Sequence, residues 1–249
     1  FFLMEGISQR AGKGGPKIIT FGIAADADVR AEDIVPEERR SVFNLCIGND
    51  RCAGVSLNVS GRANIYNALA AAAVCSALGA GIADIKKGIE SFVGMPMRLE
   101  IKELFGATVI SDVYNANPAS MEEAVRELVR LKKNRAIAVL GDMLELGTYA
   151  EEAHRKLGKW MSNLSVDFFI AVGPMMAKAA EEFSSNNGVG RKRVIVAANS
   201  SEAGRELLEA CNAGDTVLIK GSRGMHMEKV LEEGRGNPSD VPARGGNAL

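Results

Sequence analysis

The sequence predicts an α/β protein whose larger part is a Rossmann-like, doubly wound and mostly parallel sheet. Apolar segments alternate regularly with amphipathic helical segments after residue 98, and these segments are apolar throughout rather than at every second position. Strands that are buried on both faces have this composition, as in parallel sheets covered by helices. Glycine is also frequent, with 27 residues in 249, and a high glycine content suits many tight turns between strands and helices.

The composition is that of an ordinary soluble globular chain. Hydrophobic residues make up 47% and charged residues 24% of the sequence, which argues against wholesale disorder. Thirty basic side chains against 31 acidic ones leave a net charge of −1. This balance argues against nucleic acid or an anionic membrane surface as the main partner.

The 4 cysteines and 2 histidines lack the spacing of a metal site. There is no CxxC pair, so we expect no structural zinc. Cys46 and Cys52 could face each other across a hairpin, but reduced cysteines in a cytoplasmic protein are the simpler interpretation. We expect His154 on the surface of a helix and His226 packed between Met225 and Met227.

The first 94 residues predict strands followed by two helices. Expected strands cover 17–21, 41–47 and 52–59, with a hairpin around residues 48–50, and expected helices cover 64–78 and 83–92. The stretch between Arg62 and Asp84 carries no charge and approaches the ~20 residues that span a bilayer. It is mostly alanine and contains asparagines and glycines, so we interpret it as a buried helix that ends at Gly79. Gly94 and Pro96 interrupt the pattern and indicate a domain boundary.

The second region predicts a hairpin followed by regular strand–helix alternation. Expected strands cover 98–104, 107–114, 136–140, 167–172, 193–198 and 215–220, and expected helices cover 118–132, 149–163, 174–184, 201–211 and 222–232. Asn117 before a proline is typical of a helix N-cap, and Thr148 with Glu151 fits a capping box. This predicts one domain over 95–234, preceded by a separate unit over 1–94. Residues 235–249 are polar and rich in glycine and proline, and we expect a loose tail there.

Three segments follow strands at the edge where such sheets bind ligands. They are residues 112–118, 141–147 and 220–224. The third combines glycine, a hydroxyl and two cations, which suits a carboxylate or a phosphate, although a tight turn with solvated basic residues has the same composition. Asp142 and Glu145 could hold a ligand's ammonium group, or they could serve only the turn and the start of the next helix.

The common phosphate-binding and hydrolase motifs are absent from the sequence. It contains no GxxxxGK[ST], GxSxG or HExxH motif, and no GxGxxG after an expected strand. The glycines and lysine at 11–15 lack the spacing of a P-loop, and we interpret them as a loop.

Taken together, the motifs SDVYNANP (111–118), GDMLELG (141–147) and KGSR (220–223) resemble those of the Mur ligases. The resemblance covers residues 17–233 and is strongest to the branch that uses D-alanyl-D-alanine. Residues 61–73 are similar to the helix that closes the ATP-binding central domain of that family, although Ala63 stands where the family commonly has histidine. The resemblance implies that residues 1–94 are the last part of that central domain, and that 95–234 form the Rossmann-like C-terminal domain.

The resemblance also implies a reaction and its participants. An ATP- and Mg²⁺-dependent ligase would phosphorylate the carboxylate of a UDP-muramoyl tripeptide, and the amine of D-alanyl-D-alanine would then form the peptide bond. This is a step of peptidoglycan precursor synthesis in the cytoplasm. The family's P-loop, carbamylated lysine and magnesium ligands would lie upstream of Phe1, so we expect the chain alone to be inactive. An alternative is a dipeptide- or nucleotide-binding module that docks on a separate N-terminal half.

The resemblance assigns roles by position, with no catalytic residue and no metal ligand in this chain. On the nucleotide side, Asn64 and Asn67 would meet the adenine, Arg98 would lie against the nucleotide, Asp112 would bind the ribose hydroxyls, and Asn115 and Asn117 would line the domain junction. On the acceptor side, Asp142, Glu145, Lys220, Ser222 and Arg223 would face the dipeptide.

Overall fold

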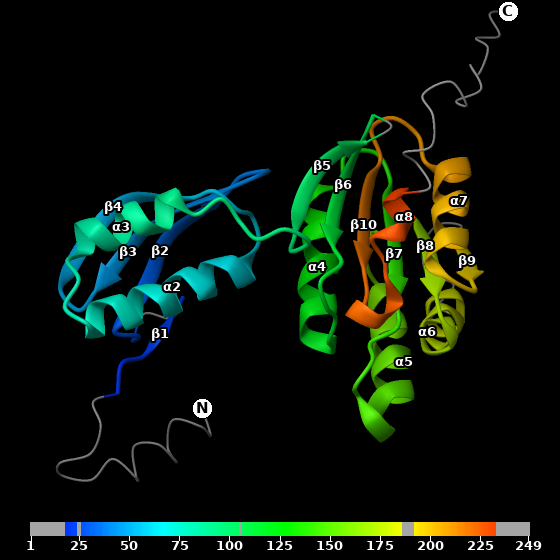
Figure 1. Cartoon of the computed structure of the whole chain (residues 1–249), viewed down its shortest axis with the longest axis horizontal. Coiled ribbons are helices and arrows are strands. Elements are labelled where there is room, and N and C mark those ends of the chain that lie inside the picture. The colour runs from blue at the N-terminus through cyan, green and yellow to red at the C-terminus, as the bar shows by residue number, and fades with distance from the viewer. Residues whose placement is uncertain (1–17, 24–25, 105, 186–191, 233–249) are drawn as a thin grey trace, which may run out of the picture. The chain divides into compact units, whose positions relative to one another are not determined.

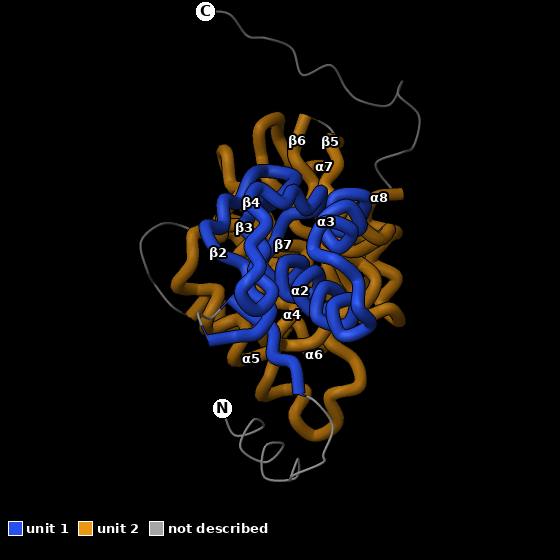
Figure 2. The backbone as a smooth tube through the Cα atoms, turned by 90° about the vertical axis from the view of Figure 1, so that its left-hand side faces the viewer, with its two compact units in different colours: residues 1–93 blue, residues 94–249 orange. Residues whose placement is uncertain are grey.

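The computed structural model describes residues 18–23, 26–104, 106–185 and 192–232. The chain divides into two compact units, residues 1–93 and residues 94–249, which Figure 2 shows in different colours. Each unit has its own sheet and its own apolar core. The expected tail over 235–249 lies outside the described residues.

Unit 1 is a four-stranded sheet with two helices packed against it (Figure 1). Its elements are β1 (Phe21–Gly22), β2 (Val29–Pro36), β3 (Ser41–Ile47), β4 (Asp50–Leu57), α2 (Arg62–Ala77) and α3 (Ile82–Ser91). The strand order is β1-β2-β3-β4, in which β1 is parallel to β2 and the other pairs are antiparallel. The predicted hairpin is confirmed, and its turn consists of residues 48–49.

Helix α2 is the predicted alanine-rich helix, but only one of its faces is buried. Ile65, Leu69 and Ala72 pack into the core of unit 1, whereas Val74 is 60% exposed. The helix ends as expected near Gly79, whose φ of +87° is left-handed, and the N–H of the next residue bonds to the carbonyl of Cys75 at 3.0 Å. A glycine after the last turn commonly ends a helix in this way. In the part of the chain that the structure describes, no helix is long and apolar enough to cross a membrane.

Unit 2 is a six-stranded sheet with helices on both faces. Its strands are β5 (Glu100–Leu104), β6 (Ala107–Asp112), β7 (Ala136–Gly141), β8 (Phe168–Val172), β9 (Arg193–Ala197) and β10 (Thr216–Lys220). Its helices are α4 (Pro118–Leu131), α5 (Ala150–Met161), α6 (Pro174–Ser185), α7 (Ser200–Ala210) and α8 (Lys229–Glu232), with short 3₁₀ turns η1 (Gly147–Tyr149) and η2 (Arg223–Met225). The order is β5-β6-β10-β7-β8-β9, and only β5 is antiparallel to its neighbour.

The two faces of this sheet have separate cores. Along β7, Ala138 and Leu140 pack under α4, α5 and α6, whereas Ile137 and Val139 pack under α7 and α8. Every residue of β6, β7, β8 and β10 is buried. This two-sided burial explains the continuous apolar runs, and it confirms the predicted doubly wound α/β fold.

The amino-terminal edge of the sheet is held by an ion pair between the starts of β7 and β10. Arg135 Nη2 lies 2.5 Å from Asp215 Oδ2, and Nε donates to Oδ1 at 3.1 Å. Burial raises the pKa of the Asp215 carboxyl, but the bonds from Arg135 and from the backbone N–H of Asn212 hold it below its usual value. Asp215 is therefore a charged group that ties two strands together at the edge opposite the three predicted loops.

Several local predictions are wrong. The strand β2 was not expected; its pattern is broken by a register shift between Glu32 and Val35, with Asp33 at a φ of +49°. The capping box at Thr148 does not form, because α5 follows a 3₁₀ turn and has no side-chain cap. The helix expected over 222–232 is only η2 and the single turn α8, since His226 between them is left-handed.

The pairing of Cys46 with Cys52, which the sequence left open as an alternative to reduced cysteines, does not form. Cys46 lies opposite Arg51, whereas Cys52 lies opposite Leu45. Successive side chains of a strand point to opposite faces of the sheet, so the two thiols diverge. All four cysteines are free.

Candidate functional site

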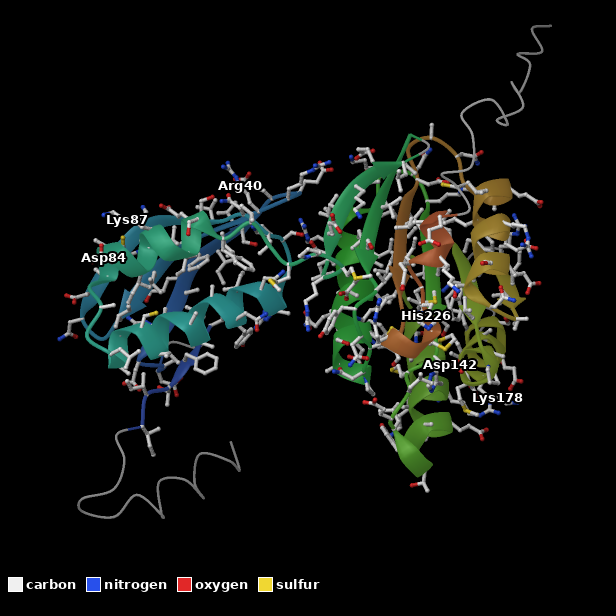
Figure 3. All side chains as sticks on the ribbon, viewed as in Figure 1. Arg40, Asp84, Lys87, Asp142, Lys178 and His226 are labelled. Carbon is white, nitrogen blue, oxygen red and sulfur yellow. The ribbon has the colours of Figure 1, made fainter. Side chains whose placement is uncertain are left out.

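The three predicted loops meet at the carboxyl edge of the unit 2 sheet. They follow β6, β10 and β7, which are neighbours in that order and run parallel. In the register of the sheet, Lys220 at the end of β10 lies opposite Asp112 on one side and Leu140 on the other. Figure 3 labels Asp142 and His226 at this end of the sheet. The expectation that the loops lie together is confirmed.

A buried ion pair joins the first and third loops. Lys220 Nζ donates to Asp112 Oδ2 at 2.6 Å and to the carbonyl of Asn115 at 2.8 Å. The Lys220 side chain is 2% exposed and that of Asp112 is 12% exposed. The backbone N–H of Leu99 lies 3.4 Å from Asp112 Oδ1, so that oxygen accepts only a long, weak hydrogen bond. A buried charge needs a charged and hydrogen-bonded partner, so each of these two residues requires the other.

Ser222 joins the second loop to the other two. Its Oγ accepts the N–H of Leu144 at 2.8 Å and lies 3.4 Å from the carbonyl of Ala116, while its own N–H donates to Asp142 O at 3.1 Å. The close approach requires glycine, because a Cβ on Gly221 would lie 3.1 Å from the Cα of Gly141. Hydrogen bonds of the Ser222 side chain therefore connect all three loops.

The two predicted carboxylates of the second loop differ in their surroundings. Asp142 is 4% exposed, and its oxygens accept the N–H groups of Met176 at 2.6 Å and Met175 at 3.3 Å, at the start of α6. Its carboxylate thus caps a helix, where a negative charge is favourable. Glu145 is exposed with a φ of +67°, and among the described residues no hydrogen bond or ion pair holds its side chain. Glu145 is the carboxylate of this loop that a ligand can reach.

Two arginines lie at the same edge. The Arg98 guanidinium stacks over the Tyr114 ring, 4.2 Å from its centroid, which is a cation–π contact. The Arg223 side chain is 55% exposed and its Nη1 lies 3.2 Å from Glu228 Oε1. Exposed pairs of this kind contribute little stability, so Arg223 can turn to a ligand at small cost.

The predicted asparagines mostly bond to the backbone near them. Asn117 caps α4 by accepting the N–H of Ser120 at 2.9 Å, as the sequence predicts. Asn115 Oδ1 accepts the N–H of Ala116. In unit 1, Asn64 donates to the carbonyl of Ser60 at 2.7 Å, and Asn67 is exposed on α2. The ligand-binding roles of these four residues stay predictions.

Both histidine predictions are wrong. His154 is fully buried; its Nε2 accepts the N–H of Met143 at 2.9 Å, and its Nδ1 lies 2.7 Å from the carbonyl of Ala150. The spacing of His154 in the sequence could have indicated its burial, because Leu157 and Met161 continue the same apolar helix face. His226 is 57% exposed rather than packed between its neighbouring methionines. Within the described ranges, no cluster of three His, Cys, Asp or Glu side chains could hold a metal ion.

This arrangement of sheet and loops belongs to a known class of ligase domains. Residues 97–223 match the family described as Mur ligase, glutamate ligase domain, and residues 4–75 match the Mur ligase middle domain. The chain belongs to the Mur ligase family, which confirms the resemblance of its motifs.

Two curated relatives that the chain matches over most of its length share one name. The chain is 30% identical over 220 residues to the UDP-N-acetylmuramoyl-tripeptide–D-alanyl-D-alanine ligase of Bacillus subtilis, covering 86% of the chain and 46% of the relative. It is 34% identical over 209 residues to the ligase of that name from Escherichia coli, covering 84% and 44%. A crystal structure of MurF from Acinetobacter baumannii superposes with a TM-score of 0.77 at 30% identity, over 87% of this chain and 46% of that one. The chain thus spans about half the length of these relatives.

We predict that Lys220 and Asp112 are strongly coupled. Lys220→Met leaves the Asp112 carboxylate buried and unpaired, and should lower the free energy of unfolding by ~3–5 kcal/mol. The double variant Lys220→Met/Asp112→Leu should lose much less than the sum of the two single variants. Urea unfolding followed by the fluorescence of Trp160, the one tryptophan in the sequence, measures all three.

Arg223→Met serves as the matched control, because it removes a cation from an exposed pair at the same edge. It should change the free energy of unfolding by less than ~1 kcal/mol. Additive single effects at Lys220 and Asp112 would contradict the account of a mutually dependent buried pair.

Proposed function

We propose that this chain carries the acceptor-binding part of an ATP-dependent amide ligase that joins D-alanyl-D-alanine to UDP-N-acetylmuramoyl-tripeptide. One observation carries the proposal. In a Mur ligase domain, the loops after β6, β7 and β10 lie at one edge of the sheet and are joined by hydrogen bonds. The relatives of this chain from Bacillus subtilis and Escherichia coli support the choice of substrates, because the names of these two proteins specify this reaction. The product belongs to peptidoglycan precursor synthesis, and we place the reaction in the cytoplasm.

The edge has the chemistry that a dipeptide zwitterion requires. D-alanyl-D-alanine has an ammonium group at one end and a carboxylate at the other, and the two exposed charged side chains of the loops are Glu145 and Arg223. We assign the carboxylate to Arg223, since guanidinium–carboxylate bonds are strong and directional, and the ammonium group to Glu145. An α-amine must lose a proton and be held in position before it attacks.

The other predicted acceptor residues are buried, and their side chains bond to other parts of unit 2. Lys220 is occupied by Asp112, Ser222 by the second loop, and Asp142 by α6. We therefore assign Lys220, Ser222 and Asp142 to holding the loops, and we assign contact with the dipeptide to Glu145 and Arg223.

We assign residues 1–94 to the ATP-binding middle domain and 95–234 to the C-terminal ligase domain. The match of residues 4–75 to the Mur ligase middle domain supports the first assignment. Bound ATP supplies the phosphoryl group that makes a carboxylate reactive toward an amine. Asp112 suits the ribose hydroxyls, because its Oδ1 has only one long contact. We also assign Asn64 and Asn67 to the adenine, Arg98 to the nucleotide, and Asn115 and Asn117 to the domain junction. We assign no Mg²⁺ ligand to this chain.

A second candidate function is a binding module that docks on a separate N-terminal half. The observation that favours it is the exposure of three large apolar side chains of unit 1, with Phe21 45%, Val74 60% and Leu78 82% exposed. Val74 and Leu78 lie one helical turn apart, and neighbouring exposed apolar side chains can form part of a surface that another chain covers.

We predict that Arg223→Ala weakens the binding of D-alanyl-D-alanine by ~1.5–3 kcal/mol, the range for a hydrogen bond to a charged group. Isothermal titration calorimetry of the purified chain measures the dissociation constant. Arg126→Ala is the matched control, because Arg126 is an equally exposed arginine on α4 and its loss should leave the affinity unchanged. Equal affinities for Arg223→Ala and the parent chain would reject the assignment.

Reconstitution separates the two candidate functions. The chain alone, with ATP, Mg²⁺ and both substrates, should release no phosphate above a blank, because its sequence has no GxxxxGK[ST] motif. Adding the unmatched upstream half of the Bacillus subtilis relative should restore formation of the dipeptide-containing product. Dipeptide binding without any product in the mixture would favour the module, and phosphate release by the chain alone would contradict this account.

A further inference from the structure

Three consecutive backbone N–H groups of the second loop are each bonded to a different element. The N–H of Asp142 donates to Val172 O at the end of β8, that of Met143 to His154 Nε2 on α5, and that of Leu144 to Ser222 Oγ after β10. Backbone donors away from water need such partners. Here the partners come from three separate parts of unit 2. Movement of this tripeptide would therefore break at least one of these hydrogen bonds.

The middle partner, His154, is the unusual one. An imidazole accepts a hydrogen bond only in its neutral form, and only at the nitrogen that carries no proton. The carbonyl of Ala150, 2.7 Å from Nδ1, requires the proton to be on Nδ1. Nε2 is therefore the acceptor, and it lies 2.9 Å from the N–H of Met143. The ring itself is fully buried.

The residues that follow this tripeptide are the ones that reach solvent. Met143 is buried, whereas Leu144 is 42% exposed and Glu145 is exposed with a left-handed φ of +67°. A non-glycine residue at such a φ is held there by its surroundings. The side chain of Leu144 lies against the third loop, where a Cβ on Gly224 would be 2.8 Å from Leu144 Cδ1. His154 thus bonds to the residue directly before the two that reach solvent.

We infer that His154 is a positioning residue of the acceptor site. Its neutral ring fixes the N–H of Met143, and through the rigid tripeptide it holds Leu144 and Glu145 facing the dipeptide. The inference rests on the proposed function for the identity of the ligand, but the His154–Met143 contact can be tested without any ligand. If the ring served only to fill the core, another ring of similar size would leave amide exchange at Met143 and dipeptide binding unchanged.

Two substitutions at His154 separate packing from hydrogen bonding. His154→Phe keeps a ring but removes the acceptor, and should speed amide exchange at Met143 by about tenfold or more. It should also weaken D-alanyl-D-alanine binding by about 3- to 10-fold, the range for one neutral hydrogen bond. His154→Gln retains an acceptor and a donor, and should restore much of both properties.

Leu157→Ala is the matched control, because it creates a cavity on the same buried face of α5 without removing a hydrogen bond to the loop. It should destabilise unit 2 at least as much as His154→Phe while leaving the dipeptide affinity and the local exchange at Met143 unchanged. Equal effects of His154→Phe and Leu157→Ala on affinity would show a merely structural role and overturn the inference. So would slow exchange at Met143 in His154→Phe.

The proposed function and this inference fail in different ways. If the parent chain does not bind D-alanyl-D-alanine, the proposed function is overturned, and with it the acceptor site that His154 would serve. If the parent chain binds the dipeptide and His154→Phe binds it equally well, the function stands and the inference is overturned. Faster exchange at Met143 together with weaker binding, both restored by His154→Gln, supports the inference.

Discussion

The arrangement of unit 2 depends on a charge that cannot be buried alone. Lys220 ends the central strand β10, and its ammonium group is satisfied by Asp112 of β6 and by the carbonyl of Asn115. Because side chains alternate along a strand, a slip of one residue would turn Lys220 to the other face of the sheet and leave Asp112 without a partner. The pair therefore specifies the register of β10 against β6.

This register has a consequence for function. With β10 in place, the loops after β6, β7 and β10 are brought to one edge, where Ser222 can bond to the other two. Lys220, Asp112, Ser222 and Asp142 are used for this assembly, whereas the charged side chains of Glu145 and Arg223 in the same loops are left exposed. The same division between supporting and contacting residues is found wherever a rigid scaffold positions binding loops. It explains why a short motif such as GDMLELG contains one buried and one exposed carboxylate.

The sequence predicts the features that depend on burial and local bonding. The apolar runs of β7, β8 and β10 indicate a sheet covered on both faces, and Asn117 before Pro118 marks the start of α4. It fails where a tertiary contact overrides the local pattern. The segment after Ser222 is not a continuous helix, because Met225 O accepts a bond from Ser200 and His226 turns left-handed. The spacing of His154 with Leu157 and Met161 could have indicated a buried histidine, but only the fold shows that its ring accepts the N–H of Met143.

Mapping of chemical-shift changes can show whether D-alanyl-D-alanine binds at the carboxyl edge of the unit 2 sheet. Isotopically labelled chain would be titrated with D-alanyl-D-alanine, with L-alanyl-L-alanine as the control. The account predicts that the D-dipeptide shifts the amide signals of residues 143–146 and 222–225, and that the control does not. Changes confined to another surface, such as the charged faces of α5 and α6 around Arg155 and Glu182, would contradict it.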